Sequence, residues 1–122
     1  MLKVEIRLKV DSIRDSEIFY CNELGLFQFE KDFGMGTISL TLKENPCFRI
    51  LLSTGLFQFS EEYLFGIETE NCNNQFNRLK KVEFNTGGKL INDDIFEYPL
   101  GKSFALIDPS RHRFLIFEEY KT

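Results

Sequence analysis

Residues 10–26 read VDSIRDSEIFYCNELGL, and this segment predicts a helix with a marked start and a marked end. Ser12 is a favourable N-cap, and Asp15 stands where a capping box places an acidic side chain. One helical face collects Ile13, Ser16, Tyr20 and Leu24. Gly25 can adopt the left-handed conformation that closes a helix. Residues 2–10 and 27–33 alternate on either side, so the unit is strand, helix, strand.

The rest of the chain repeats this plan, and alternating apolar and polar residues predict the other strands. The expected strands lie at residues 2–10, 27–33, 37–43, 47–53, 61–69, 102–107 and 112–118. A second helix is expected at residues 71–83, and residues 89–96 read as a ragged strand or an extended loop. Both halves therefore follow the order βαβββ. We expect one domain over residues 1–122, with module one at 1–54, a linker at 54–60 and module two at 61–120.

Composition narrows the class of protein and of partner. The chain is 43% hydrophobic and 28% charged, which is typical of a soluble globular domain. Its net charge of −4 argues against nucleic acid as a partner, because phosphate neutralisation needs a basic face. No apolar run is long enough to span a membrane, and the alternating N-terminus resembles neither a signal nor a transit peptide. The three cysteines lack CxxC spacing and predict reduced thiols in a cytoplasmic protein.

The two βαβββ units, with FYCNELGL after the first strand and an Asp108-Pro109 turn before the last, resemble the vicinal oxygen chelate superfamily. This superfamily includes glyoxalase I, fosfomycin-resistance transferases, extradiol dioxygenases and bleomycin-binding proteins. The Pro99-x-Gly101 approach to a strand and His112 after the turn also match. The resemblance implies an α+β fold in which two curved half-barrels enclose a cleft, with the helices outside. It also implies a homodimer.

The enzymes of this superfamily hold a divalent metal with His, Gln or Glu side chains in the cleft. The resemblance places the ligand positions at Glu5, Leu64, Leu115 and a residue near Ile50 or Leu51. Of these, only Glu5 offers a metal ligand, and a metal site needs several converging donors. We therefore expect no metal and no other cofactor.

Strand alternation predicts which side chains would face the cleft, because alternate residues share a face. If the helices cover the apolar face, the expected polar site residues are Glu5, Arg7, Arg49, Glu68 and Arg113. The expected apolar walls are Leu64, Leu115 and Phe117, with Tyr98 as a possible lid contact. Such a mixture suits a small-molecule site. A solvated or partner-covered face with mutually paired charges explains the same pattern equally well.

Three functions fit these expectations. The first is a metal-independent small-molecule binding protein, similar to the bleomycin-binding branch, which sequesters a drug or metabolite. The second is a divergent glyoxalase-like lyase, isomerase or dioxygenase-type enzyme that uses groups such as Glu5 and Glu68 for acid–base chemistry. The third is a structural or interaction subunit without a ligand. His112 and Cys72 are expected to be structural residues, the latter as a buried, unreactive thiol.

Overall fold

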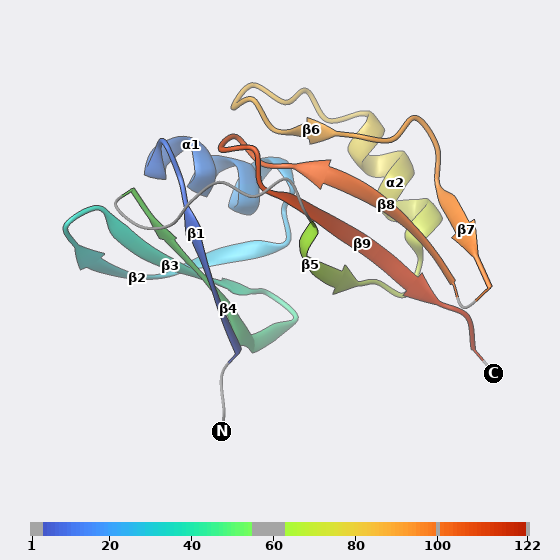
Figure 1. The fold of residues 1–122 in the computed structure, drawn as a ribbon, viewed down its shortest axis with the longest axis horizontal. Helices are drawn as coiled ribbons and strands as arrows, with labels where there is room; N and C mark the ends of the chain where they lie inside the picture. The colour runs from blue at the N-terminus through green and yellow to red at the C-terminus, as the bar shows by residue number, and fades with distance from the viewer. Residues whose placement is uncertain (1–3, 55–62, 100, 122) are drawn as a thin grey trace.

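The computed structural model describes residues 4–54, 63–99 and 101–121, and it folds them into two β-sheets with helices packed on one side (Figure 1). The elements in chain order are β1 (Val4–Lys9), α1 (Ile13–Ile18), the π-helix η1 (Phe19–Glu23), β2 (Phe27–Gly34), β3 (Thr37–Leu42), β4 (Asn45–Ser53), β5 (Tyr63–Glu68), α2 (Cys72–Lys80), β6 (Lys89–Leu90), β7 (Phe96–Tyr98), β8 (Gly101–Ile107) and β9 (Arg113–Glu119). The predicted α+β fold of two βαβββ units is confirmed.

Both sheets have the same strand topology. The first sheet runs β1-β4-β3-β2, and the second runs β5-β9-β8-β6 with β7 also paired to β8. In each sheet the first and last strands of the unit are parallel neighbours, β1 with β4 and β5 with β9. The segment expected to be a ragged strand or a loop forms the two short strands β6 and β7, which share β8 as their partner.

The helix predicted from residues 10–26 has the expected ends and an unexpected middle. The Ser12 side chain accepts a hydrogen bond from the Asp15 amide at 3.1 Å, and Gly25 has a φ of +75°. From Phe19 to Glu23 the helix widens, and the Leu24 amide donates to the Phe19 carbonyl. The side-chain pattern of a helix does not reveal such a π-turn. Phe19 and Tyr20, which open this turn, are both fully buried.

An aromatic core joins the two halves of the chain. The Tyr20 ring packs edge-to-face on Phe27, with centroids 5.4 Å apart, and also contacts Phe114 of β9. Phe65 of β5 stacks on Phe114 at 5.0 Å and packs against Phe48 of β4. Helix α1 packs on β3 and β4, and α2 packs on β8 and β9. Part of the high phenylalanine content therefore builds the contact between the two halves.

The Asp108-Pro109 turn binds the end of β1. Oδ1 of Asp108 accepts hydrogen bonds from the Ser110 and His112 amides, at 2.9 and 2.8 Å. The Asp11 amide donates to Oγ of Ser110 at 2.7 Å, and Nε2 of the buried His112 contacts the carbonyl of Lys9. His112 is thus part of a structural junction, as expected.

Several predicted boundaries need correction. Strand β4 begins at Asn45, before the expected start at residue 47, so Pro46 lies inside the strand. Helix α2 ends at Lys80, short of the expected residue 83. The expectations for residues 2–3, for the linker at 55–60 and for residues 61–62 lie outside the described residues, and so does residue 100 between Pro99 and Gly101. Within the described ranges, no helix is long and apolar enough to cross a membrane.

Candidate functional site

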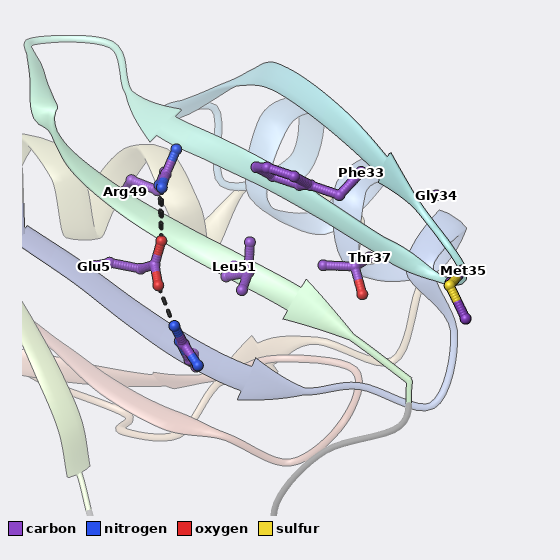
Figure 2. Close-up of a pocket in the computed structure, with 8 residues that line it drawn as sticks. Glu5, Phe33, Gly34, Met35, Thr37, Arg49 and Leu51 are labelled. Atoms are coloured by element: carbon purple, nitrogen blue, oxygen red, sulfur yellow. Dashed lines mark hydrogen bonds and ion pairs between the residues drawn. The ribbon is translucent and has the colours of Figure 1, made fainter.

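A pocket of about 420 Å³ lies on the face of the first sheet that points away from the helices (Figure 2). It is lined by Glu5, Arg7, Phe33, Gly34, Met35, Thr37, Arg49 and Leu51. Strand parity creates this face: Leu8, Ile50 and Leu52 are buried on the core side, so their sequence neighbours point the other way. The register pairs Glu5 with Arg49 and Arg7 with Leu51 across β1 and β4.

Four charged side chains form a continuous chain of ion pairs on this face. Nη1 of Arg49 lies 3.1 Å from Oε1 of Glu30, and Nη2 lies 2.8 Å from Oε1 of Glu5. The second oxygen of Glu5 accepts from Nε of Arg7 at 2.9 Å. Oε1 of Glu30 also accepts from the Ser39 hydroxyl at 2.7 Å. The order Glu30–Arg49–Glu5–Arg7 therefore alternates in charge and is neutral as a whole, and Figure 2 shows the two pairs made by Glu5.

These pairs shift the ionisation of their members. The hydrogen bond from Arg7, together with the contacts to Arg49, lowers the pKa of Glu5. The hydrogen bond to Glu30 is the main reason that the pKa of Arg49 is raised further. Both groups are therefore charged at neutral pH.

The other end of the pocket is apolar. Phe33 is 45% exposed, and its ring centroid lies 5.9 Å from the Arg49 guanidinium carbon and 5.0 Å from the ammonium of Lys31. Met35 is fully exposed at the tip of the β2–β3 hairpin, with a left-handed φ of 55°. A positive φ is uncommon for a methionine. The flanking glycines Gly34 and Gly36 also have positive φ angles. The hairpin thus presents an apolar rim beside the charged chain.

The residues predicted for the site fall on both sheets. Glu5, Arg7 and Arg49 line the pocket of the first sheet. The other predicted residues do not line this pocket; they lie on the second sheet and are Leu64, Glu68, Tyr98, Arg113, Leu115 and Phe117.

On the second sheet, strand pairing places Glu68, Leu115 and Phe117. Leu115 pairs with Gly66, and Phe117 pairs with Glu68. A Cβ added to Gly66 would lie 3.0 Å from the Phe117 ring, so the ring lies directly over this glycine. Tyr98 stacks on Phe96 at 5.9 Å. Nε of Arg113 is buried and has no hydrogen-bond partner in the described part of the chain.

Sequence reasoning did not assign Glu30, Phe33, Thr37, Met35 or Leu51 to the site. Leu51 could have been found, because it shares strand parity with Arg49. Glu30 and Phe33 could not, because the β2–β3 register shifts between Phe29 and Lys31 and again between Asp32 and Gly34. Each shift breaks the alternation on which the assignment of faces depends.

The residues present do not fit the metal site of the superfamily. Both oxygens of Glu5 already accept hydrogen bonds from arginine, and Leu64 and Leu115 offer no ligand atom. No group of three or more His, Cys, Asp or Glu side chains within residues 4–54, 63–99 and 101–121 could hold a metal ion. We therefore derive no chemistry through a metal.

The cysteines lie apart from the pocket. Cys72 is buried, and its amide donates to Oε1 of Glu118 at 2.8 Å. Burial raises the pKa of the Cys72 thiol to about 11, and burial likewise raises the pKa of Cys21 to about 11. Neither thiol is therefore suited to act as a nucleophile at neutral pH.

Comparison with known proteins identifies the fold. A scan of protein-family models finds no match, and a search of curated proteins finds none either. Among solved structures, an antibiotic binding protein from Streptomyces sp. CB03234, TnmS3, superposes with a TM-score of 0.79 and 14% identity over 98% of this chain and 97% of that chain. UcmS2 superposes with a TM-score of 0.75 and 18% identity over 96% and 97% of the two chains.

A third similar structure comes from a protein whose superfamily is known. It is a member of the glyoxalase/bleomycin resistance protein/dioxygenase superfamily from Sphaerobacter thermophilus DSM 20745, with a TM-score of 0.75 and 16% identity over 98% of each chain. The fold expected from the resemblance to the vicinal oxygen chelate superfamily is therefore confirmed. Identities this low establish the fold, and function has to be argued from the site.

Proposed function

We propose that this protein binds and sequesters a small organic molecule, a drug or a metabolite, on the exposed face of the first sheet and without a metal ion. The observation that carries the proposal is the composition of the pocket. Paired charges occupy one end, the exposed Phe33 ring and Met35 occupy the other, and Leu51 lies between them. Apolar walls with a few fixed polar groups are the usual makeup of a small-molecule site.

Two further observations support binding over catalysis. Glu5, which would act as the acid–base group of an enzyme, is held as a carboxylate between Arg7 and Arg49 and is therefore a weak base at neutral pH. The structural neighbour TnmS3 is described as an antibiotic binding protein. The remaining parts of the proposal are a cytoplasmic location and a homodimer, in which a second copy would cover the exposed side chain of Phe29 on β2.

A thermal-shift screen tests the proposed function. The purified protein would be screened against antibiotics and small metabolites, each with and without divalent metal ions. We expect an organic compound to raise the melting temperature equally well in the presence of a chelator. Stabilisation by a metal ion alone would contradict the proposal and favour a lyase, isomerase or dioxygenase. Absence of stabilisation by every compound would contradict it as well and favour a structural subunit.

The site is tested by repeating the screen hits on two variants. Phe33→Ala removes the exposed ring of the pocket, and Phe96→Ala removes a ring on β7 that is also exposed and lies outside it. We expect the first variant to lose most of the ligand-induced stabilisation and the second to retain it. Equal losses in the two variants would contradict the placement of the site.

A further inference from the structure

The ion-pair chain of the pocket has one closed end and one open end. At the closed end, Glu30 accepts from both Arg49 and the buried Ser39 hydroxyl. At the open end, the side chain of Arg7 is 58% exposed, whereas that of Glu5 is 24% exposed. Arg7 contacts Glu5 through Nε, and its terminal nitrogens make no hydrogen bond to the described residues. The outermost group of the ion-pair chain, which a ligand would meet first, is therefore the positively charged guanidinium of Arg7.

A cationic ligand would find no comparable partner in this pocket. Glu5 is engaged through both oxygens, and Glu30 accepts from two donors. A cation would have to displace an arginine from one of these carboxylates, which would leave a guanidinium unpaired. An anion needs no such exchange, because it can bind the exposed terminal nitrogens of Arg7. The ion-pair chain would then read Glu30–Arg49–Glu5–Arg7–anion, with opposite charges still adjacent. Guanidinium groups bind carboxylate and other planar or tetrahedral oxyanions through paired N–H donors.

The apolar end specifies the rest of the ligand. The half-exposed Phe33 ring offers a face for stacking, and Leu51 and Met35 supply apolar contacts beside it. The Phe33 centroid lies 5.9 Å from the guanidinium carbon of Arg49, which is the neighbour of Glu5 in the ion-pair chain, and Phe33 and Arg7 line the same pocket. One flat molecule can therefore span both ends.

Resting on the proposed function, we infer that the ligand of this pocket is a planar aromatic molecule that carries an anionic group, with the anion on Arg7 and the ring on Phe33. This assigns the chemical class of the ligand and gives Arg7 a direct role in binding. It also distinguishes the pocket from one that would select a cationic aromatic drug.

Three matched probes test the inference: naphthalene carboxylate, its neutral carboxamide, and cationic aminomethylnaphthalene. The protein contains no tryptophan, so naphthalene fluorescence can be followed without indole emission. We expect the carboxylate to bind about fivefold more tightly than the carboxamide, because an exposed arginine contact contributes at most about 1 kcal/mol. We expect the ammonium compound to bind most weakly, and the preference for the carboxylate to shrink as salt is added.

Three variants test which side chain contacts the charged group of the probe and which contacts its ring. Arg7→Ala should abolish the preference for the carboxylate over the carboxamide, whereas Phe33→Ala should weaken both. Arg14→Ala, an exposed arginine on α1, is the matched control and should change neither. Circular dichroism of each variant checks that the fold is intact.

The outcomes separate this inference from the proposed function. Tighter Phe33-dependent binding of the ammonium compound, or a carboxylate preference that survives Arg7→Ala, overturns the inference and leaves the small-molecule function standing. Failure of all three probes to bind also overturns the inference, and the thermal-shift screen then decides the function by itself.

Discussion

The hydroxyl of Tyr20 donates a hydrogen bond to Oδ2 of Asp108 at 2.9 Å, across 88 residues of sequence. This contact joins the helical segment of the first half to the turn of the second half, inside the aromatic core. Burial raises the pKa of the Tyr20 hydroxyl well above its ordinary value, so it stays protonated and acts as a donor. Burial likewise raises the pKa of Asp108, and its hydrogen bonds with His112, Tyr20 and Ser110 oppose that rise.

The first prediction concerns this contact. Tyr20→Phe removes the donor and leaves Oδ2 of Asp108 buried without it, so we expect the free energy of unfolding to fall by about 1–3 kcal/mol. Urea denaturation of the variant and the parent measures the difference. Tyr63→Phe, on an exposed tyrosine of β5, is the control and should be nearly neutral. A fall of the same size in both variants would show that the Tyr20–Asp108 hydrogen bond stabilises the fold no more than the hydroxyl of an exposed tyrosine does.

The second prediction concerns Gly101, where β8 begins. A Cβ at this position would lie 2.2 Å from the carbonyl oxygen of Glu118, an atom of the backbone that cannot move aside. We expect Gly101→Ala to cost about 1–3 kcal/mol or more, because β8 and β9 must separate locally. Gly66→Ala is the comparison, since there the added atom meets the Phe117 side chain at 3.0 Å and the ring can shift. In thermal melts, the melting temperature of Gly101→Ala should be well below that of Gly66→Ala. The reverse order would contradict the β8–β9 register.

The third prediction concerns the pH dependence of the ion-pair chain. Because the pKa of Glu5 is lowered in the folded state, its pairs stabilise the fold fully above the ordinary value of 4.5. That contribution is lost as the pH falls through the folded-state pKa. Glu5→Gln should therefore be less stable than the parent at neutral pH, by about 1 kcal/mol or less, with the difference closing in acid. Unfolding free energies measured from about pH 3 to about pH 7 check this; a constant difference would show that the Glu5 charge contributes nothing.

The fourth prediction concerns thiol reactivity. Because the pKa values of Cys21 and Cys72 are raised to about 11, few of their thiols are ionised at neutral pH. In a Cys47→Ser background, we expect both to react with a disulfide reagent much more slowly in the folded protein than in urea. Rapid reaction of either thiol in the folded state would contradict the burial that raises its pKa.

Sequence patterns captured those parts of the fold that depend on regular alternation and on local caps. The faces of β1 and β4 followed from strict alternation, which is why Glu5, Arg7 and Arg49 were correctly brought onto one sheet. Ser12 and Gly25 marked the helix ends, because capping is a local interaction. The π-turn at Phe19–Glu23 was not visible in the sequence, since the spacing of apolar residues does not distinguish it from a regular helix.

The candidate site was predicted less completely than the fold. Register shifts in β2 concealed Glu30 and Phe33, and these shifts depend on pairing with β3 and not on the residues of β2 alone. The pair between Glu5 and Arg49 could not be assigned either, because the two residues are 44 positions apart in the sequence, and the reach of Arg49 toward Glu30 depends on the same shifted register. Strand parity indicates which face a side chain lies on; it does not indicate which neighbour it binds.

Backbone amide NMR shifts during a ligand titration would show whether a small organic molecule binds the pocket of the first sheet. The ligand would be the compound that stabilises the protein most in the thermal-shift screen, added in the presence of a chelator. We predict that the largest shift changes fall on Glu5, Phe33, Arg49 and Leu51, and that Phe33→Ala removes them. Changes confined to β5 and β9 of the second sheet, or changes that require a divalent metal, would contradict metal-independent binding at this pocket.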